Sequence, residues 1–191
     1  MKKHKIAISD TDILINLAKI DRLDLLDLLF DEIIIPHYVY DKELSKKAGK
    51  LFRKINLKIN DSDSIFKVVD RKKDFVINKL AEPIIREKYN YIGKGESECA
   101  GYASAIGTSI IVSDNKSDFK WLDDEYIMLT HNNILAICVN RNLITNEEAE
   151  NIYTSINNTL SYPSSLNFSQ VYLKSISRFK KKGWDNILGI N

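Results

Sequence analysis

The stretch GKGESECAGYASAIGTSIIVSDNKSDF, residues 93–119, predicts both the fold and the position of a site in this chain. Small residues from Gly95 to Ile106 follow a helical pattern, and the apolar run 109–113 predicts a buried strand. Glu96 lies at the start of that helix, and Asp114 and Asp118 follow the strand. Because helix starts and strand ends meet at the carboxyl edge of a parallel sheet, we expect these carboxylates to gather there. Such a cluster costs free energy unless a cation neutralises it, which is the first indication of a metal.

Length and composition favour a single cytoplasmic domain. The chain has 191 residues, 44% of them apolar, and a net charge of +2, so a nucleic-acid site must come from local basic patches. Cys99 and Cys138 lie within apolar helical patterns and are expected to be buried, reduced thiols. The first apolar run ends at Asp10 after four residues, so neither a signal peptide nor a membrane span is predicted.

Apolar runs alternate with helical patterns along the chain. Strands are expected at 6–9, 32–36, 109–113 and 126–130, and helices at 11–20, 22–30, 38–48, 95–106, 132–140, 145–157 and 169–182. Asp21 is a candidate cap for the second helix. The order β-α-α-β-α predicts an α/β fold with a parallel sheet and crossover helices. We expect a core over 1–142, with a helical insertion at about 50–92, and a C-terminal helical extension over 143–191 packed on the same domain.

Acidic residues mark the carboxyl ends of three predicted strands. Asp10 ends the first strand, Asp41 and Glu43 lie near the start of the helix after the second, and Asp114 and Asp118 follow the third. Carboxylate oxygens suit Mg²⁺ or Mn²⁺, and no His/Cys set has zinc spacing. Such an ion would lower the pKa of its water and hold a phosphate oxygen, as in metal-assisted phosphodiester cleavage. Each acid alone is more typical of a helix cap or a turn, so only their matching positions favour a site.

The chain resembles the PIN-domain family, metal-dependent ribonucleases that include the VapC-type toxins of toxin–antitoxin pairs. The resemblance spans nearly the whole chain, is nearest to a branch of small uncharacterised prokaryotic PIN proteins, and rests on ISDTDILINLAKIDRLDLLDLLF, IIIPHYVYDKEL, GKGESECAGYASA and IIVSDNKSDF. It implies a three-layer α/β/α sandwich with a parallel sheet of four to five strands and extra C-terminal helices. It also implies an endoribonuclease that cleaves single-stranded or structured RNA by metal-activated water, with an antitoxin protein and a second copy of the chain as candidate partners.

The resemblance also assigns the acids one by one. The first family acid falls on Asp10, the third on Glu96, the fourth on Asp114, and the further acid of the D-x-x-x-D pattern on Asp118. Asp10, Glu96 and Asp114 are then the expected metal ligands, and Glu98 is expected to lie outside the ligand set. All of these acids are candidate catalytic residues apart from Glu98.

The second family acid is the weakest match. Lys42 stands where relatives would carry a carboxylate, with Asp41 and Glu43 on either side. Either neighbour can supply the group after a small helix shift, and Glu43 is favoured because E-L at a helix start is the common family form. Thr11 and Asp12 occupy the positions that usually orient the first acid.

Basic side chains near this second acid predict an RNA-binding surface. Residues 42–58 hold seven Lys or Arg against one acid, Glu43, and the tail 169–184 holds five basic residues and no acid. In the tail, Tyr172, Phe179 and Trp184 are candidate stacking groups for bases. The candidate substrate-binding residues are Thr11, Asp12, Lys42, Lys46 and Arg53. The histidines, His4, His37 and His131, are expected to be structural.

Two other functions fit parts of the pattern. DTDIL and SDNKSD resemble the first and last acidic motifs of haloacid-dehalogenase-type phosphatases, in which Asp10 would be a phosphorylated nucleophile. That fold needs a glycine-containing flap after the first motif, where this chain has the apolar helix LINLAKI, and it leaves Glu96 unexplained. Lys42 supports the second alternative, a catalytically weakened PIN-fold protein that binds RNA or a partner.

Overall fold

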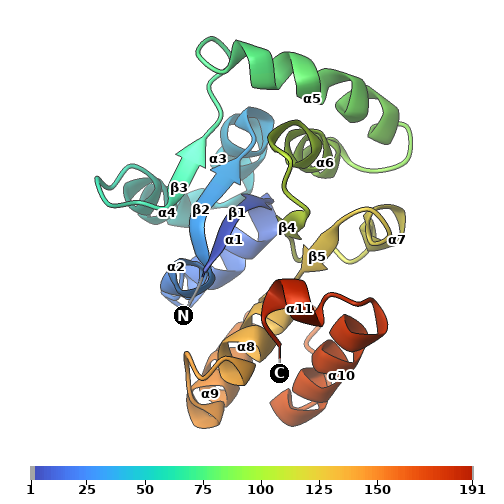
Figure 1. The fold of residues 1–191 in the computed structure, drawn as a ribbon. Coiled ribbons are helices and arrows are strands. Elements are labelled where there is room, and N and C mark those ends of the chain that lie inside the picture. The colour runs from blue at the N-terminus through green and yellow to red at the C-terminus, as the bar shows by residue number, and fades with distance from the viewer. Residues whose placement is uncertain (1–2, 191) are drawn as a thin grey trace.

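A five-stranded parallel sheet forms the centre of the molecule, with the strand order β3-β2-β1-β4-β5 (Figure 1). The computed structural model describes residues 3–190, apart from the side chain of Phe119. All four neighbouring strand pairs run parallel. The strands are β1 His4–Ser9, β2 Phe30–Ile35, β3 Phe66–Val68, β4 Ile110–Val112 and β5 Ile127–Leu129. Because β1 is the middle strand, the residue after it lies at the centre of the carboxyl edge.

Helices cover both faces of this sheet, which confirms the predicted three-layer α/β/α sandwich. Figure 1 shows the green helices α5 and α6 on the opposite side of the strands from the orange-to-red helices α8–α11. A π-helical turn, Val39–Leu44, and a 3₁₀ turn, Gly49–Leu51, flank α3. The helices are α1 Thr11–Lys19, α2 Asp24–Leu29, α3 Ser45–Lys47, α4 Phe52–Ile59, α5 Phe75–Lys88, α6 Lys94–Ile106, α7 Phe119–Leu122, α8 His131–Asn140, α9 Asn146–Asn157, α10 Phe168–Lys181 and α11 Asp185–Leu188.

The small residues of α6 explain how the chain holds this helix so close to its neighbours. Helix α6 packs on β1 and β4, and α5 packs over α6. A Cβ at Gly101 would lie 2.3 Å from Ile85 Cγ1 and 2.9 Å from the Ala81 carbonyl oxygen, both on α5. Glycine is therefore required at the α5–α6 crossing. This packing fixes the start of α6 against the carboxyl ends of β1 and β4.

The C-terminal helices belong to the same packed unit as the sheet. Helices α9 and α10 pack against α8, and α9 also contacts α1. Thr145 caps α9 by accepting a hydrogen bond from the Glu148 N–H, as the T-x-x-E pattern predicts. Cys99 and Cys138 are both free and buried, as expected. No helix within the described range is long and apolar enough to cross a membrane.

Two details of the fold differ from the prediction. Helices alone were expected in 50–92, but Phe66–Val68 forms the edge strand β3, which pairs with β2 between helices α4 and α5. This strand is three residues long, so its alternating pattern merges with the helical spacing around it. Asp21 does not cap α2, because its backbone is left-handed, with a φ of 61°, and the helix begins only at Asp24.

Candidate active site

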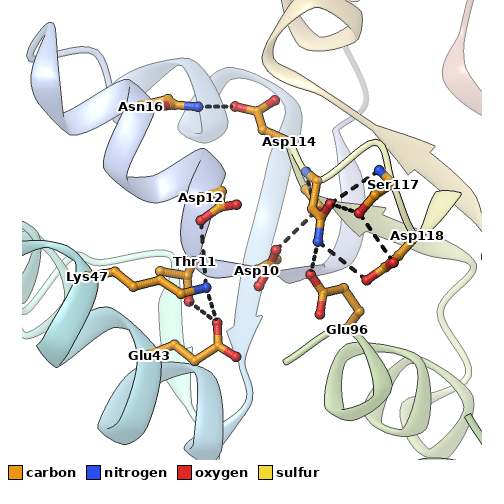
Figure 2. A network of polar contacts seen from close by, with 12 residues as sticks. Asp10, Thr11, Asp12, Asn16, Glu43, Lys47, Glu96, Asp114, Ser117 and Asp118 are labelled. Carbon is orange, nitrogen blue, oxygen red and sulfur yellow. Dashed lines mark hydrogen bonds and ion pairs between the residues drawn. The ribbon is translucent and has the colours of Figure 1, made fainter. Parts of the chain in front are cut away.

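Acidic side chains from four separate segments meet at the carboxyl edge of the sheet (Figure 2). Asp10 follows β1, Glu43 lies in the π-helical turn after β2, and Glu96 lies in the first turn of α6. Asp114 and Asp118 lie in the loop after β4. The parallel sheet therefore brings together residues that are more than 100 positions apart in the chain.

Asp10 is the most deeply buried of these acids, with 2% of its surface exposed. It stands at the N-cap position of α1, yet its side chain makes no capping hydrogen bond. Oδ2 accepts a hydrogen bond of 3.0 Å from Ser113 Oγ, while Oδ1 is buried without a partner among the described residues. Burial, and then the negative charge of Glu96, raise the pKa of Asp10 to about 7. A capping role does not explain this carboxylate, whereas a role as a cation ligand does.

Glu96 and Asp118 are joined by the side-chain amide of Asn115, a residue that the sequence did not single out. Asn115 Nδ2 donates to Glu96 Oε1 and lies 3.4 Å from Asp118 Oδ2. Burial raises the pKa of Glu96, although the hydrogen bond from Asn115 opposes the shift. A Cβ at Gly93 would lie 2.4 Å from Glu96 Oε2, so this glycine leaves room for the carboxylate.

Glu43, and not Asp41, reaches the acid cluster. Glu43 Oε2 accepts hydrogen bonds from Thr11 Oγ1 at 3.3 Å and from Lys47 Nζ at 2.8 Å. Asp41 instead lies on the exposed side of the turn, where its Oδ2 is 2.9 Å from His37 Nε2. A Cβ at Gly95 would lie 2.6 Å from Glu43 Oε1, so the glycine before Glu96 is what lets the two segments meet.

The carboxylate of Asp114 is directed to the other side of its loop. Its Oδ2 accepts a hydrogen bond of 2.7 Å from Asn16 Nδ2 (Figure 2), and its Oδ1 accepts one of 2.9 Å from the His131 N–H. Burial alone would raise the pKa of Asp114, but His131 and Asn16 together hold it below its usual range. Both oxygens thus already accept hydrogen bonds, but Oδ2 accepts only the one from Asn16 among the described residues and keeps a lone pair that a metal can use. Its role as a ligand stays a prediction.

The basic residues after Glu43 divide into paired and unpaired groups. Lys54 and Lys58 form ion pairs of 2.7 Å with Asp21 and Asp27. Lys47 bridges Glu43 and Asp12, whose Oδ1 is 4.0 Å away. The three predicted substrate-binding cations are exposed and have no ion pair with another described residue: Lys42, Lys46 and Arg53.

The predicted stacking residues of the tail do not form an exposed aromatic surface. Phe179 is fully buried, so its predicted contact with bases is wrong, and Trp184 is half-buried beneath Arg178, at 4.9 Å. An exposed aromatic pair lies instead beside the site, where the rings of Tyr91 and Trp121 stack with their centroids 5.6 Å apart. Their surfaces are 60% and 46% exposed. They flank the glycine turn and the 114–118 loop in sequence.

The donor groups at this edge fit a divalent cation. Asp10 supplies a buried oxygen that has no partner among the described residues, Glu96 lies beside it, and Gly93 and Gly95 keep side chains out of the space between segments. Within residues 3–190, no group of three or more His, Cys, Asp or Glu side chains is arranged so that it could hold a metal ion, so the three predicted ligands do not form a ready-made site. Mg²⁺ commonly binds through one or two carboxylates and keeps several waters, so a full protein cage is not needed. Asp10 and Glu96 are the residues that would hold the ion.

Comparison with known proteins agrees with this geometry. A family model described as a PIN domain matches residues 6–171, whereas no curated protein and no solved structure matches significantly. PIN domains are in general nucleases that use divalent metal ions. Since the match covers well over half of the sequence and the observed sandwich is consistent with it, the chain belongs to the PIN-domain family.

Proposed function

We propose that this protein is an endoribonuclease that uses Mg²⁺ or Mn²⁺ to hydrolyse phosphodiester bonds of RNA. The observation that carries the proposal is Asp10 Oδ1, a buried carboxylate oxygen without a described partner, beside a second carboxylate, Glu96. A divalent ion held there supplies positive charge for the phosphate and lowers the pKa of a water. No haloacid-dehalogenase flap intervenes, because α1 begins directly after Asp10.

The side chains of the chain itself have separate tasks in this proposal. Asp10 and Glu96 bind the ion, and Ser113 holds Asp10 in place through its hydroxyl. Glu43 lies across the site with its carboxylate fixed by Thr11, where it can orient a water or a second ion. Asn115 keeps Glu96 and Asp118 at a fixed separation. Each of these carboxylates is thus held by a neutral hydrogen-bond donor of the chain itself.

RNA binding would begin on the exposed cations next to this site. Lys42, Lys46 and Arg53 offer charges that are not used by a described acid. Tyr91 and Trp121 offer an exposed stacked pair on which bases could stack without regard to sequence. A role as the toxin of a toxin–antitoxin pair, an antitoxin partner and a homodimer stay predictions that follow from the resemblance, and a cytoplasmic location stays a prediction that follows from the composition.

The test is cleavage of a fluorescently labelled single-stranded RNA by the purified chain in Mg²⁺, in Mn²⁺ and in excess chelator. We expect cleavage only with metal, and a loss of about 100-fold or more in Asp10→Asn and in Glu96→Gln, because each removes charge that the ion needs. Asp31→Asn is the matched control, since Asp31 is exposed near the start of β2, at the opposite edge of the sheet.

Four outcomes would count against the proposal. RNA decay that is equal with and without chelator would exclude a metal nuclease. Equal rates for Asp10→Asn and Asp31→Asn would place the chemistry elsewhere. Metal-dependent hydrolysis of p-nitrophenyl phosphate without RNA cleavage would support the phosphatase alternative, and RNA binding without any cleavage would support the weakened, binding-only member of the family.

A further inference from the structure

A second cleft, of about 430 Å³, lies beside the acid cluster, between helix α10, the start of α8 and the loop after β4. None of the proposed metal-binding acids lines it. It nevertheless shares two segments with the site, because Lys116 directly follows Asn115 and Thr130 directly precedes His131. A chain of nucleotides bound at the acid cluster could therefore continue into this cleft.

The charge of the cleft is opposite to that of the acid cluster. Three cations line it, Lys116, Lys174 and Arg178, and none of its lining residues is Asp or Glu. Arg178 is occupied, since it bonds to Asp123 and to the Met128 carbonyl oxygen. Lys116 and Lys174 are exposed and have no hydrogen bond or ion pair with another described residue. Two lysines are thus available to an anionic ligand at the two sides of one cleft.

One wall of the cleft is already fixed without a ligand. Asn133 Oδ1 accepts hydrogen bonds from the Thr130 N–H at 3.1 Å and from Arg178 at 3.3 Å. Its Nδ2 donates to Ser175 Oγ at 3.0 Å, which ties the start of α8 to α10. A ligand that enters meets a wall that has already lost its conformational freedom, so little ordering cost remains.

The lysines need an anionic acceptor, whereas Asn132 needs a hydrogen-bond donor. Its Oδ1 is buried and has no hydrogen-bond partner among the described residues, although the residue lines the cleft. A buried acceptor of this sort needs a donor. A phosphodiester alone offers acceptors only, but a ribonucleotide offers phosphate oxygens to the two lysines and a hydroxyl or amino group to Asn132. The set of groups therefore suits a nucleotide better than an isolated anion.

We propose that this cleft binds the sugar–phosphate backbone of the RNA strand beyond the position of cleavage, with Lys116 and Lys174 on phosphate and Asn132 as acceptor for a ribose or base donor. The inference rests on the proposed function, and it makes α10 a part of the substrate-binding surface.

The experiment measures binding separately from cleavage. Fluorescence anisotropy of a labelled single-stranded RNA in excess chelator reports affinity for the full chain between 50 and 200 mM salt. One phosphate contact on a single strand contributes about 0.7 to the salt slope, which is about fivefold in affinity at 0.1 M. Lys174→Ala should therefore bind about fivefold more weakly, with a slope reduced by about 0.7. Lys181→Ala, on the same helix but outside the cleft, should bind like the wild type.

A further variant tests Asn132. If its oxygen accepts from a ribose hydroxyl or base, Asn132→Ala should weaken RNA binding while the salt slope stays unchanged, because no phosphate contact is lost. Equal affinity and equal slope for Lys174→Ala and Lys181→Ala would overturn the proposal, as would an absence of RNA binding by the wild type. RNA binding that depends on Lys174, without any cleavage, would contradict the proposed function but support the cleft as an RNA-binding site. Full cleavage with no effect of Lys174→Ala on binding would support the proposed function but contradict the proposal for the cleft.

Discussion

Asp114 and His131 form a buried pair at the carboxyl edge of the sheet, with Asp114 Oδ1 2.9 Å from His131 Nδ1 and 2.9 Å from the His131 backbone nitrogen. Their side chains are only 8% and 7% exposed. The pair joins the loop after β4 to the first residue of α8, and Asn16 on α1 holds the second oxygen of the same carboxylate. Three elements around the site thus converge on one acid.

We predict that this pair stabilises the loop in a non-additive way. His131→Leu and Asp114→Asn should each lower the free energy of unfolding by about 1–3 kcal/mol, because each leaves a buried polar group without its partner. The double variant should lose less than the sum, with a coupling energy of about 0.5–3 kcal/mol. Urea unfolding at pH 7 of the four proteins measures the cycle. Strict additivity would show that the two side chains do not act as a pair.

A second prediction concerns the dependence of stability on pH. The pKa of Asp10 is about 7 in the folded protein, against an ordinary value of 3.8, so the folded state keeps a proton that the unfolded chain releases between these two values. The stability due to this group is therefore present at low pH and is lost as pH rises toward 7. In chelator, Asp10→Asn should match the wild type near pH 4 and exceed it near pH 8, by on the order of 2–4 kcal/mol.

The difference between the two proteins is the quantity to measure, because other groups titrate in the same range. Burial, and then the charge of Arg141, lower the pKa of His4 to about 4, which acts in the opposite direction but equally in both proteins. Mn²⁺ at 1,000 times its Kd should cancel or reverse this difference at pH 8, since its binding to the wild type adds about 4.1 kcal/mol. A stability difference that is constant from pH 4 to 8 would contradict the assignment.

The success and the errors of the sequence analysis have physical causes. The positions of Asp10 and Glu96 at the carboxyl edge were predictable, because a strand end and a helix start have fixed places in a parallel sheet, whatever the side-chain rotamers. Asp114 and Asn115 were harder, because they are adjacent in an extended loop and face opposite sides. The available signal was the alternation of side chains along an extended segment. Ser113 bonds to Asp10 and Asn115 bonds to Glu96, so Asp114, which lies between them, points to the other side.

Other features of the structure could not be predicted because they depend on contacts or local geometry that the sequence pattern does not indicate. No neighbour of His131 in the sequence indicates its contact with Asp114, because Asp114 follows β4 and His131 follows β5, the neighbouring strand of the sheet. The edge strand β3 is too short for its pattern to be separated from the helices around it. The preference for Glu43 over Asp41 agrees with the position of Glu43 in the structure, but it rested on the resemblance alone, because no residue spacing indicates the π-helical turn that leaves Glu43 facing the site.

Two glycines of α6 should separate function from stability. Gly95→Ala should reduce metal-dependent cleavage at least about tenfold, because its Cβ would lie 2.6 Å from Glu43 Oε1, while the overall fold is kept. Gly101→Ala, on the same helix, should lower the free energy of unfolding by about 1–3 kcal/mol, because its Cβ would lie 2.9 Å from a backbone oxygen of α5. Thermal unfolding and cleavage rates of both variants are compared. A Gly95→Ala protein with wild-type activity would show that Glu43 has no part in the site.

The last prediction concerns Lys47, because its ammonium group already neutralises part of the negative charge that a metal ion would neutralise. Its Nζ lies 2.8 Å from Glu43 and 4.0 Å from Asp12, and these acids raise the pKa of Lys47 although burial opposes the shift, so the lysine is charged at neutral pH. Removal of that charge in Lys47→Gln should tighten Mn²⁺ binding severalfold. Two unit charges 4 Å apart interact by about 1 kcal/mol even in water, and the repulsion between Lys47 and the ion is of this order. The control is Lys46→Gln, which removes the same charge from an exposed neighbour without an ion pair to a described residue and should leave the Kd near that of the wild type. Calorimetric titration of both variants with Mn²⁺ measures the difference, and equal Kd values would show that Lys47 does not compete with the ion.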